Sequence, residues 1–336
     1  MEVGIILGDV KASVPPREHL RNLLRQVEAA QRNGFTTICM GQHWLYGEYR
    51  WLQPIPTFAR LAAEVTADTR LVPTVLVVPV QNPVILAEDL ATLDIVTDGR
   101  LSIGVGIGYR QEEFRQLGVP FEERFKRFEE SLQIMRALWT QDVVTYPGQF
   151  WQLEEATTHI RPIQTPHPPV WIGAQQDVGV RRAARLGDTW PIPPAMPLDE
   201  VRSRIALFQE TRAELGLPPC ERFPLRREVT VGKDREDALR RYEQRARGKY
   251  VAYAQRDRTW AGSAEQLSSS FAEQVSDHVI AGTAEECIAQ LTAIARELPV
   301  GPLVVRPQWP DMEPDDVVAY LDELGREVVP AMKALP

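Results

Sequence analysis

Cysteine is scarce in this chain of 336 residues, which has only Cys39, Cys220 and Cys287. The three form no C-x-x-C pair and are odd in number, so we expect neither a disulfide framework nor a thiolate zinc site. No group of His, Asp and Glu has metal-ligand spacing, and no metal is expected. These absences are typical of a protein in a reducing cytoplasm.

Long apolar runs and an excess of positive charge are also missing. No uninterrupted run of about 18 apolar residues occurs, so we expect no membrane-spanning helix. The amino end, MEVGIILGDVKASVPP, lacks the basic n-region of a secretion signal. The 38 Lys and Arg against 46 Asp and Glu give a net charge of -8, which disfavours nucleic acid as a partner.

Short apolar runs do occur, and they alternate with longer amphipathic segments. The run from Val3 to Leu7 predicts a buried strand, and apolar residues from Leu20 to Ala30 follow at helical spacing. Similar strands begin near residues 36, 70 and 101. The spacing gives a unit of roughly 30 to 35 residues, the size of a βα repeat.

The second half of the chain continues this pattern with two interruptions. The segment near 141–169 alternates around Pro147-Gly148 like a hairpin and then becomes rich in proline, and a second irregular stretch is expected near 247–277. VWIGA, DTWPIP, RREVTVG and PLVVRP are predicted as the fifth to eighth strands. We therefore expect one α/β domain over residues 1–336, a (β/α)8 TIM barrel with inserted segments.

Strand ends are the places to look for a site, because the loops that follow the strands of such a barrel meet above one end of it. Residues at these ends also carry a family resemblance, in the stretches GFTTICMGQHW, LSIGVGIGYRQEEF, LGVPFEER and RPIQTPHPPVWIGAQQDVGVRRAARLGD. With these the chain resembles the bacterial luciferase-like family of flavin-dependent oxidoreductases over nearly its whole length. The resemblance implies a barrel that holds reduced FMN, or in sister branches the deazaflavin coenzyme, above the strand ends.

A catalytic role for His43 is implied by this resemblance, since it matches a histidine that lies beside the flavin in family members. An imidazole can pass a proton or hydrogen-bond a reactive intermediate near neutral pH. The family usually has an acidic residue just before it, whereas this chain has Gln42, which removes a possible charge partner. The alternative is a packed loop histidine.

Four further cofactor contacts are expected on the third and fourth strands. Thr74-Val75 matches the place of a non-prolyl cis peptide bond in relatives, although without the resemblance a plain buried strand is expected there. Gly106 and Gly108 belong to GVGIGY, whose spacing is wrong for a dinucleotide fingerprint. Small residues here either let a flat ring approach the backbone or permit close strand packing.

Phosphate contacts are expected from two loops. Tyr109 and Arg110 are candidates for contact with the ribityl phosphate or an anionic substrate, the alternative being that Arg110 pairs with Glu112 or Glu113. The other candidates are four residues between the fifth strand and the next helix, where backbone N–H groups and the helix dipole favour an anion. They are Gly173, Ala174, Gln175 and Gln176, and an ordinary βα turn is the alternative. Relatives often have a second glycine at position 174 and a serine at 176.

Aromatic residues gather near the predicted strand ends. They would line an apolar chamber that excludes water, or pack the inserted segments against the barrel. The predicted substrate contacts are Trp44, Tyr46, Trp51, Trp190 and Trp309, with Tyr49 beside them.

The resemblance implies a two-component monooxygenase, in which reduced FMN from a separate reductase reacts with O2 to give a C4a-peroxyflavin that oxygenates a small organic substrate. One alternative is a deazaflavin-dependent enzyme that transfers a hydride without O2. Another is a non-catalytic flavin-binding barrel. The resemblance also implies a homodimer, formed through helices of the first four units.

Overall fold

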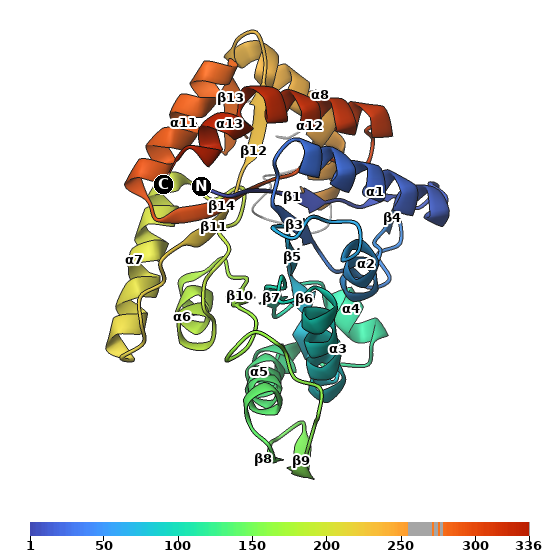
Figure 1. Cartoon of the computed structure of the whole chain (residues 1–336), viewed down its shortest axis with the longest axis vertical. Coiled ribbons are helices and arrows are strands. Elements are labelled where there is room, and N and C mark those ends of the chain that lie inside the picture. Colours follow the sequence, from blue (N-terminus) through green and yellow to red (C-terminus); the bar gives the residue numbers. More distant parts are fainter. Residues whose placement is uncertain (255–270, 272–274, 276–277, 336) are drawn as a thin grey trace.

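Parallel strands and the helices around them make up the protein (Figure 1). The computed structural model describes residues 1–254, 271, 275 and 278–335. The strands are β1 (Val3–Leu7), β2 (Val10–Lys11), β3 (Thr37–Met40), β4 (Tyr49–Arg50), β5 (Arg70–Pro73), β6 (Leu76–Val77), β7 (Ile103–Gly106), β8 (Val144–Pro147), β9 (Gln152–Ala156), β10 (Val170–Ile172), β11 (Phe223–Arg226), β12 (Glu228–Val231), β13 (Val279–Gly282) and β14 (Val300–Val305).

The helices mostly follow the strands one by one, as the repeat predicts. They are α1 (Pro16–Arg32), α2 (Pro54–Leu61), the short 3-10 turn η1 (Val78–Val80), α3 (Pro83–Val96), α4 (Gln111–Gln116), η2 (Phe121–Glu123), α5 (Arg124–Thr140), α6 (Asp177–Leu186), α7 (Leu198–Glu214), α8 (Arg235–Ala254), α11 (Ala284–Glu297), α12 (Pro314–Glu327) and α13 (Val329–Lys333). Local chemistry sets their ends: Asn82 caps α3 through its side chain, and Gly34, with φ +81°, ends the turn after α1.

Two parallel sheets form the framework. One has the order β11-β14-β1-β3-β5 and the other β10-β7-β6. Single parallel bridges join Leu71 to Leu101, Trp171 to Thr189, and Ile192 to Leu225. The result is a mixed α/β fold with a parallel half-barrel, which confirms the α/β part of the predicted class.

Alternation along the strands divides their side chains between two sides. Ile5, Ile38 and Leu71 belong to the main core, which the helices cover. Their neighbours Ile6, Cys39 and Val72, together with Trp171 and Val304, form a separate small cluster on the other face. This second face is the interior of the curved sheet, and we call the cluster the interior layer.

The seventh strand differs from the prediction. RREVTVG was expected to form it, but FPLR comes first as β11 and pairs with β14, while β12 follows after Arg227 and pairs with β13. The buried guanidinium of Arg227 donates to backbone oxygens of Pro193 (3.0 Å), Pro194 (3.1 Å) and Met196 (2.8 Å). Residue 227 therefore lies at the junction between two strands that pair with different partners.

Of the two irregular segments, the first contains the predicted hairpin. β8 and β9 pair antiparallel around Pro147-Gly148, and the turn is fastened by Glu130, which accepts from the backbone N–H of Phe150 (2.9 Å) and Trp151 (2.7 Å). The expected start of the second segment near residue 247 is wrong, because α8 continues to Ala254. Most of the rest of 247–277 lies outside the described residues.

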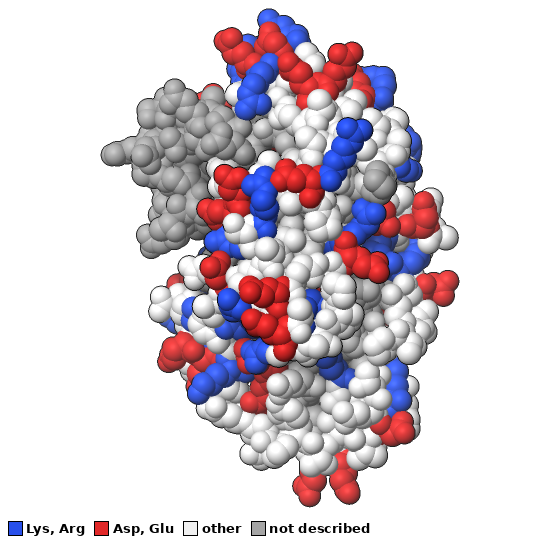
Figure 2. Space-filling model, turned by 90° about the vertical axis from the view of Figure 1, so that its left-hand side faces the viewer, with Lys and Arg blue, Asp and Glu red and all other residues white. Residues whose placement is uncertain are grey.

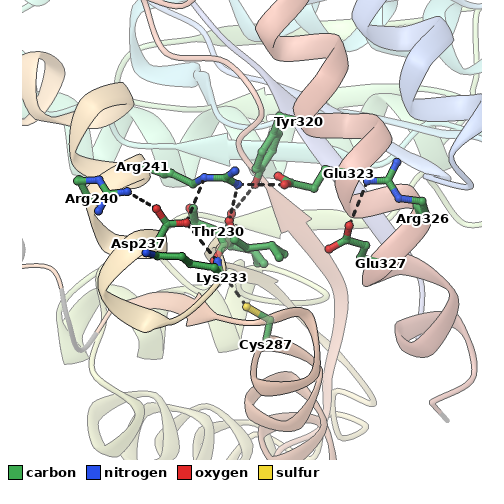
Figure 3. A network of polar contacts seen from close by, with 12 residues as sticks. Thr230, Lys233, Asp237, Arg240, Arg241, Cys287, Tyr320, Glu323, Arg326 and Glu327 are labelled. Atoms are coloured by element: carbon green, nitrogen blue, oxygen red, sulfur yellow. Dashed lines mark hydrogen bonds and ion pairs between the residues drawn. The ribbon is translucent and has the colours of Figure 1, made fainter.

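Polar contacts fix the first half of α8 against α12 and β12 (Figure 3). Arg241 donates to the backbone oxygen of Val231 (2.9 Å) and to Glu323 (3.0 Å), and the Tyr320 hydroxyl donates to β12 (2.6 Å). The second half of α8 carries Lys249, which belongs to the candidate site.

On the outer face shown in Figure 2, acidic and basic side chains are mixed over the upper part, and the lower part is largely uncharged.

Candidate functional site

His43, in the loop after β3, is held by a carboxylate from another element. Its Nδ1 lies 2.8 Å from Oε1 of Glu113 on α4, and the same oxygen accepts from the backbone N–H of Trp44 (3.0 Å) and from Arg110 (3.0 Å). Because the carboxylate accepts, Nδ1 carries the proton and Nε2 is left to accept in the neutral ring. The Tyr109 hydroxyl lies 3.2 Å from that Nε2.

Glu113 belongs to the candidate site, although the sequence analysis named it only as a possible partner of Arg110. Its side chain is only 1% exposed. Burial would raise its pKa, but the hydrogen bond and charge of His43, the Trp44 N–H and Arg110 outweigh burial, so that its pKa is lowered. In relatives an acidic residue precedes the histidine, and this chain has Gln42 there. Glu113 supplies the negative charge beside His43 instead. The available signal was the spacing of Glu113, one helical turn after Arg110, a pairing that the sequence offered only as an alternative.

Gln42 connects the 43–51 loop to adjacent segments through hydrogen bonds. Its side-chain oxygen accepts from the backbone N–H of Val77 (2.9 Å), and its amide nitrogen donates to Gln53 (3.0 Å). Gln53 in turn donates to the backbone oxygen of His43 (3.0 Å). The backbone on both sides of the imidazole is thus fixed.

Aromatic rings surround the imidazole. The rings of Tyr46 and Trp51 each lie 4.7 Å from that of His43, and the ring of Tyr109 lies at 5.8 Å. The guanidinium of Arg110 lies 4.1 Å from the centre of the Tyr46 ring. The structure therefore brings together the predicted residues of the 43–51 loop and of the 109–110 loop.

The peptide bond between Thr74 and Val75 is cis, as the resemblance implies. It lies beside the 43–51 loop, because a Cβ on Gly41 would be 3.1 Å from the Trp51 ring and 3.6 Å from the Thr74 oxygen. A Cβ on Gly106 would lie 2.8 Å from the Val75 side chain, and one on Gly173 would lie 3.1 Å from it. These two glycines therefore leave room for Val75, which connects three neighbouring strand ends.

Gly108 has a separate backbone reason for being glycine. Its φ is +73°, and a Cβ there would lie 2.7 Å from the Phe114 ring. The residue turns the chain from β7 toward α4 and so places Tyr109, Arg110 and Glu113 around the imidazole.

The turn after β10 leads directly into α6, as predicted. The N–H of Gly173 is used in the sheet, where it donates to Val105 (2.9 Å), while Gln175 and Gln176 are exposed at the start of the helix. Ala174 accepts a hydrogen bond from Trp190 through its backbone oxygen (2.9 Å). Asp177, in the first turn of α6, lies 3.3 Å from Arg204.

Trp190 and Trp309 do not lie where a substrate contact was expected. Trp190 is completely buried and belongs to the main core, because alternation turns residue 190 toward the helices and Pro191 toward the interior. Trp309 is buried in a second cluster with Tyr242, Tyr250 and Phe271. Both are packed rather than open to a ligand.

A buried ion cluster lies at the ends of β1 and β14. Asp9 is fully buried and pairs with Arg306 (2.7 Å) and with Lys249 from α8. Burial would raise the pKa of Asp9, but the two cations outweigh it and lower that pKa. The Lys249 ammonium also lies 3.7 Å from the centre of the Tyr49 ring, so the cluster supports the aromatic loop.

The inward-facing residues at the strand ends are partly exposed to solvent, in contrast to the interior layer beneath them. Cys39, Val72 and Val304 of that layer are at most 5% exposed. The partly exposed residues at these strand ends, here called the rim, are Gly41, Thr74, Gly173, Pro191 and Arg226. A ligand at the rim would rest on an apolar layer.

Neither a metal cluster nor a membrane span is found in the part of the chain that the structure describes. No three His, Cys, Asp or Glu side chains there are grouped to hold a metal ion. No helix there is both long and apolar enough to cross a bilayer.

Comparison with known proteins agrees with this geometry. The model of a family described as luciferase-like monooxygenase matches residues 1–300. The chain belongs to the luciferase-like monooxygenase family. The resemblance inferred from the sequence is thereby confirmed.

Relatives within or near the luciferase-like family use two kinds of cofactor. An FMNH2-dependent dimethylsulfone monooxygenase from Pseudomonas putida is 34% identical over 110 residues, which are 32% of this chain and 30% of the relative. An F420-dependent glucose-6-phosphate dehydrogenase from Segniliparus rotundus is 33% identical over 180 residues, 50% of this chain and 51% of the relative. The chain spans about half the length of the curated relatives it matches.

The luciferase-like fold extends over the whole chain. The crystal structure of a monooxygenase from Streptomyces bottropensis has a TM-score of 0.83 and 24% sequence identity. The likeness covers 99% of this chain and 100% of that protein. At this level of identity the comparison describes the fold and not the chemistry.

Proposed function

We propose that the protein is a two-component flavin monooxygenase, which takes reduced FMN from a separate reductase and uses O2 to oxygenate a small organic substrate. The observation that carries this proposal is the chain of contacts from Glu113 through His43 to Tyr109. Family membership and the FMNH2-dependent relative support it.

The residues present fit a flavin. The rim is partly exposed above an apolar layer, and Val75 presents its side chain between the ends of β7 and β10. Beyond Gly173, the backbone N–H groups of Gln175 and Gln176 at the start of α6 would hold the phosphate. When bound, reduced FMN supplies the electrons and reacts with O2.

The chain itself would orient the reaction and manage one proton. Glu113 fixes the imidazole through Nδ1, so that Nε2 is presented beside the Tyr109 hydroxyl. From this position His43 can accept or return a proton through Tyr109. Trp44, Tyr46 and Trp51 would exclude water around it, and their apolar surface would contact the substrate.

We further infer that the strands close into a (β/α)8 barrel forming one domain. The two sheets and the three single bridges connect in one cyclic order, in which the segment from Thr189 to Ile192 stands between β10 and β11. Closure of this ring would place His43 and the turn after β10 at the same end.

Cofactor choice is the first thing to test. Purified protein is titrated with reduced FMN and with reduced F420 without oxygen, and oxygen uptake is then followed with each. We expect tight binding of FMN and O2 consumption. Binding of F420 with hydride transfer and no O2 uptake would overturn the proposal, in favour of the alternative that the dehydrogenase relative suggests. FMN binding without oxygen-dependent turnover of any substrate would favour a non-catalytic barrel.

His43 is tested with the same preparation. Replacement by alanine should slow the reaction of bound reduced FMN with O2 about 100-fold, the usual effect of losing a proton-transfer group. The matched control is His159→Ala, since His159 is exposed in the 157–169 segment. Equal rates in the H43A variant and the wild type would remove His43 from the mechanism.

A homodimer through the first four units is also proposed. Large apolar side chains are exposed on α3, where Ile85 is 62% and Val96 48% exposed, and an apolar surface of this kind is typical of an interface. Sedimentation of the wild type should give twice the chain mass. Ile85→Glu should give a monomer. Val178→Glu, at a position on α6 that is 70% exposed, should not. A monomeric wild type at micromolar concentration would refute the proposal.

A further inference from the structure

Arg226, at the end of β11, points into the curved sheet rather than toward the helices. Its neighbour Leu225 pairs with Leu303, and both belong to the main core. Arg226 itself pairs with Val304, which belongs to the interior layer. Residues paired across parallel strands share a face, so the guanidinium lies on the interior side. It is the charged member of the rim.

The guanidinium is only partly committed to other groups. It makes an ion pair of 3.2 Å with Glu228, and its Nε has no hydrogen-bond partner among the described residues. The side chain is 26% exposed, whereas that of Glu228 is 4% exposed. The buried Nε is closed to solvent, so the exposed part of the guanidinium is the part that a molecule entering from the rim can contact.

Two neighbouring arginines, by contrast, are buried and bound to groups of the protein itself. Arg306 is 7% exposed and is bound to Asp9 (2.7 Å) and to the backbone oxygen of Gln308 (2.9 Å). Arg227 is buried and donates to several backbone oxygens. Backbone and carboxylate contacts account for both of these side chains, whereas Arg226 has only its ion pair with Glu228 and keeps part of its guanidinium exposed on the interior side.

The charge of Arg226 reaches the layer on which a ligand would rest. Burial raises the pKa of the Cys39 thiol in that layer to about 12, and the charge of Arg226 opposes this rise. β11 and β5 are the two edge strands of the five-stranded sheet, so in the closed barrel inferred above Arg226 would face Thr74 and Val75 across the interior, where the proposed flavin ring would lie. A substrate between these walls would meet apolar side chains below it and one cation at its side.

We propose that Arg226 binds an anionic group of the organic substrate, a carboxylate or a sulfonate, and so selects acids over neutral molecules of the same shape. This inference rests on the proposed function, since it concerns the substrate of the same site. A guanidinium is suited to the task because its parallel N–H donors match the two oxygens of such a group. Glu228 would keep the side chain in place when no substrate is bound.

Small acids and their amides test this directly. Tryptophan fluorescence of the FMN-loaded protein is followed during titration with benzoate, octanoate and ethanesulfonate, each against its neutral amide. We expect the wild type to bind the acids at least about tenfold more tightly than the amides, the effect of one or two charge-assisted hydrogen bonds. Arg226→Gln should abolish this preference, and Arg226→Lys should keep part of it. Glu228→Gln should preserve or strengthen it, because a competing carboxylate is removed.

Three outcomes would overturn the inference. In the first, the wild type binds acids no more tightly than amides. In the second, R226Q retains the preference for acids. In the third, R226Q weakens the binding of reduced FMN as much as the binding of acids, which would mean that Arg226 binds the flavin. If R226Q does not fold, the inference is tested by the wild-type preference for acids over amides and by the reduction of that preference in R226K. FMN affinity is measured separately. A wild type that binds FMN but does not prefer acids defeats this inference alone, and a wild type that does not bind FMN defeats the proposed function.

Discussion

Replacing Glu113 with glutamine tests the central contact of the site. The side chain keeps its size but loses the charge that three donors share, namely His43, the Trp44 N–H and Arg110. Because the carboxylate is 1% exposed, solvent does not screen these contacts. The variant therefore removes charge assistance without leaving a hole.

The magnitude follows from the number of bonds. A charge-assisted hydrogen bond is about twice as strong as a neutral one, whose net contribution is about 1 kcal/mol. Three such losses, offset in part by the smaller cost of burying an amide, predict that E113Q lowers the free energy of unfolding by about 1–3 kcal/mol at pH 7. Glu113→Ala leaves the donors without an acceptor and should cost about 3–5 kcal/mol.

The effect of E113Q should also depend on pH. The folded protein lowers the pKa of Glu113, so the stabilisation is complete above the unfolded value of about 4.3 and is lost as the pH falls through the folded value. The difference between wild type and variant should therefore narrow in acid.

Urea unfolding followed by tryptophan fluorescence at several pH values measures this difference. The control is Glu112→Gln, because the neighbouring carboxylate is exposed and bonds only to side chains of its own helix in the part of the chain described. E112Q should leave the unfolding curve unchanged. Equal stability of E113Q and wild type at pH 7, or a difference that does not vary with pH, would refute the reasoning.

Three further predictions concern packing and buried charge. Asp9→Ala removes the buried carboxylate that Lys249 and Arg306 share and should lower the free energy of unfolding by about 3–5 kcal/mol, measured in urea; a loss as small as that of an exposed residue would contradict it. Trp190→Ala should lower the free energy of unfolding by about 3–5 kcal/mol and leave FMN affinity unchanged. A loss of FMN binding without a loss of stability would show that Trp190 belongs to the site. Gly106→Ala should lower the free energy of unfolding by about 1–3 kcal/mol, because the added Cβ would contact Val75. In a double-mutant cycle, Val75→Ala should relieve part of this loss. Strictly additive effects would show that the two positions do not touch.

Periodicity made the βα units predictable, because a strand buried on both faces and an amphipathic helix leave different patterns in the sequence. The seventh strand was misplaced for a physical reason. In its polar run, Arg226 faces the interior and pairs with Glu228, while Arg227 between them binds backbone oxygens on the other side. Charge at both positions hides the alternation that identifies a strand.

The site was predictable only in part. Proximity along the chain correctly grouped the residues of the 43–51 loop, and the family resemblance indicated the cis peptide. Glu113 and Lys249 could not be found in this way, because each reaches the loop from a distant element. Trp190 was misjudged because a strand end exposes every second residue, and periodicity over two or three residues does not say which.

The pairing of Asp9 with Lys249 joins residues separated by 240 positions. Bringing such distant points together costs chain entropy that only a nearly finished structure can offset. The tyrosine-rich loop near the amino end consequently receives its supporting ammonium group late, after α8 has been synthesised and docked. A nascent chain that stops before this helix would have His43 and Glu113 but an unsupported loop beside them, so ligand affinity in this protein should report on completion of the whole chain rather than of its first half.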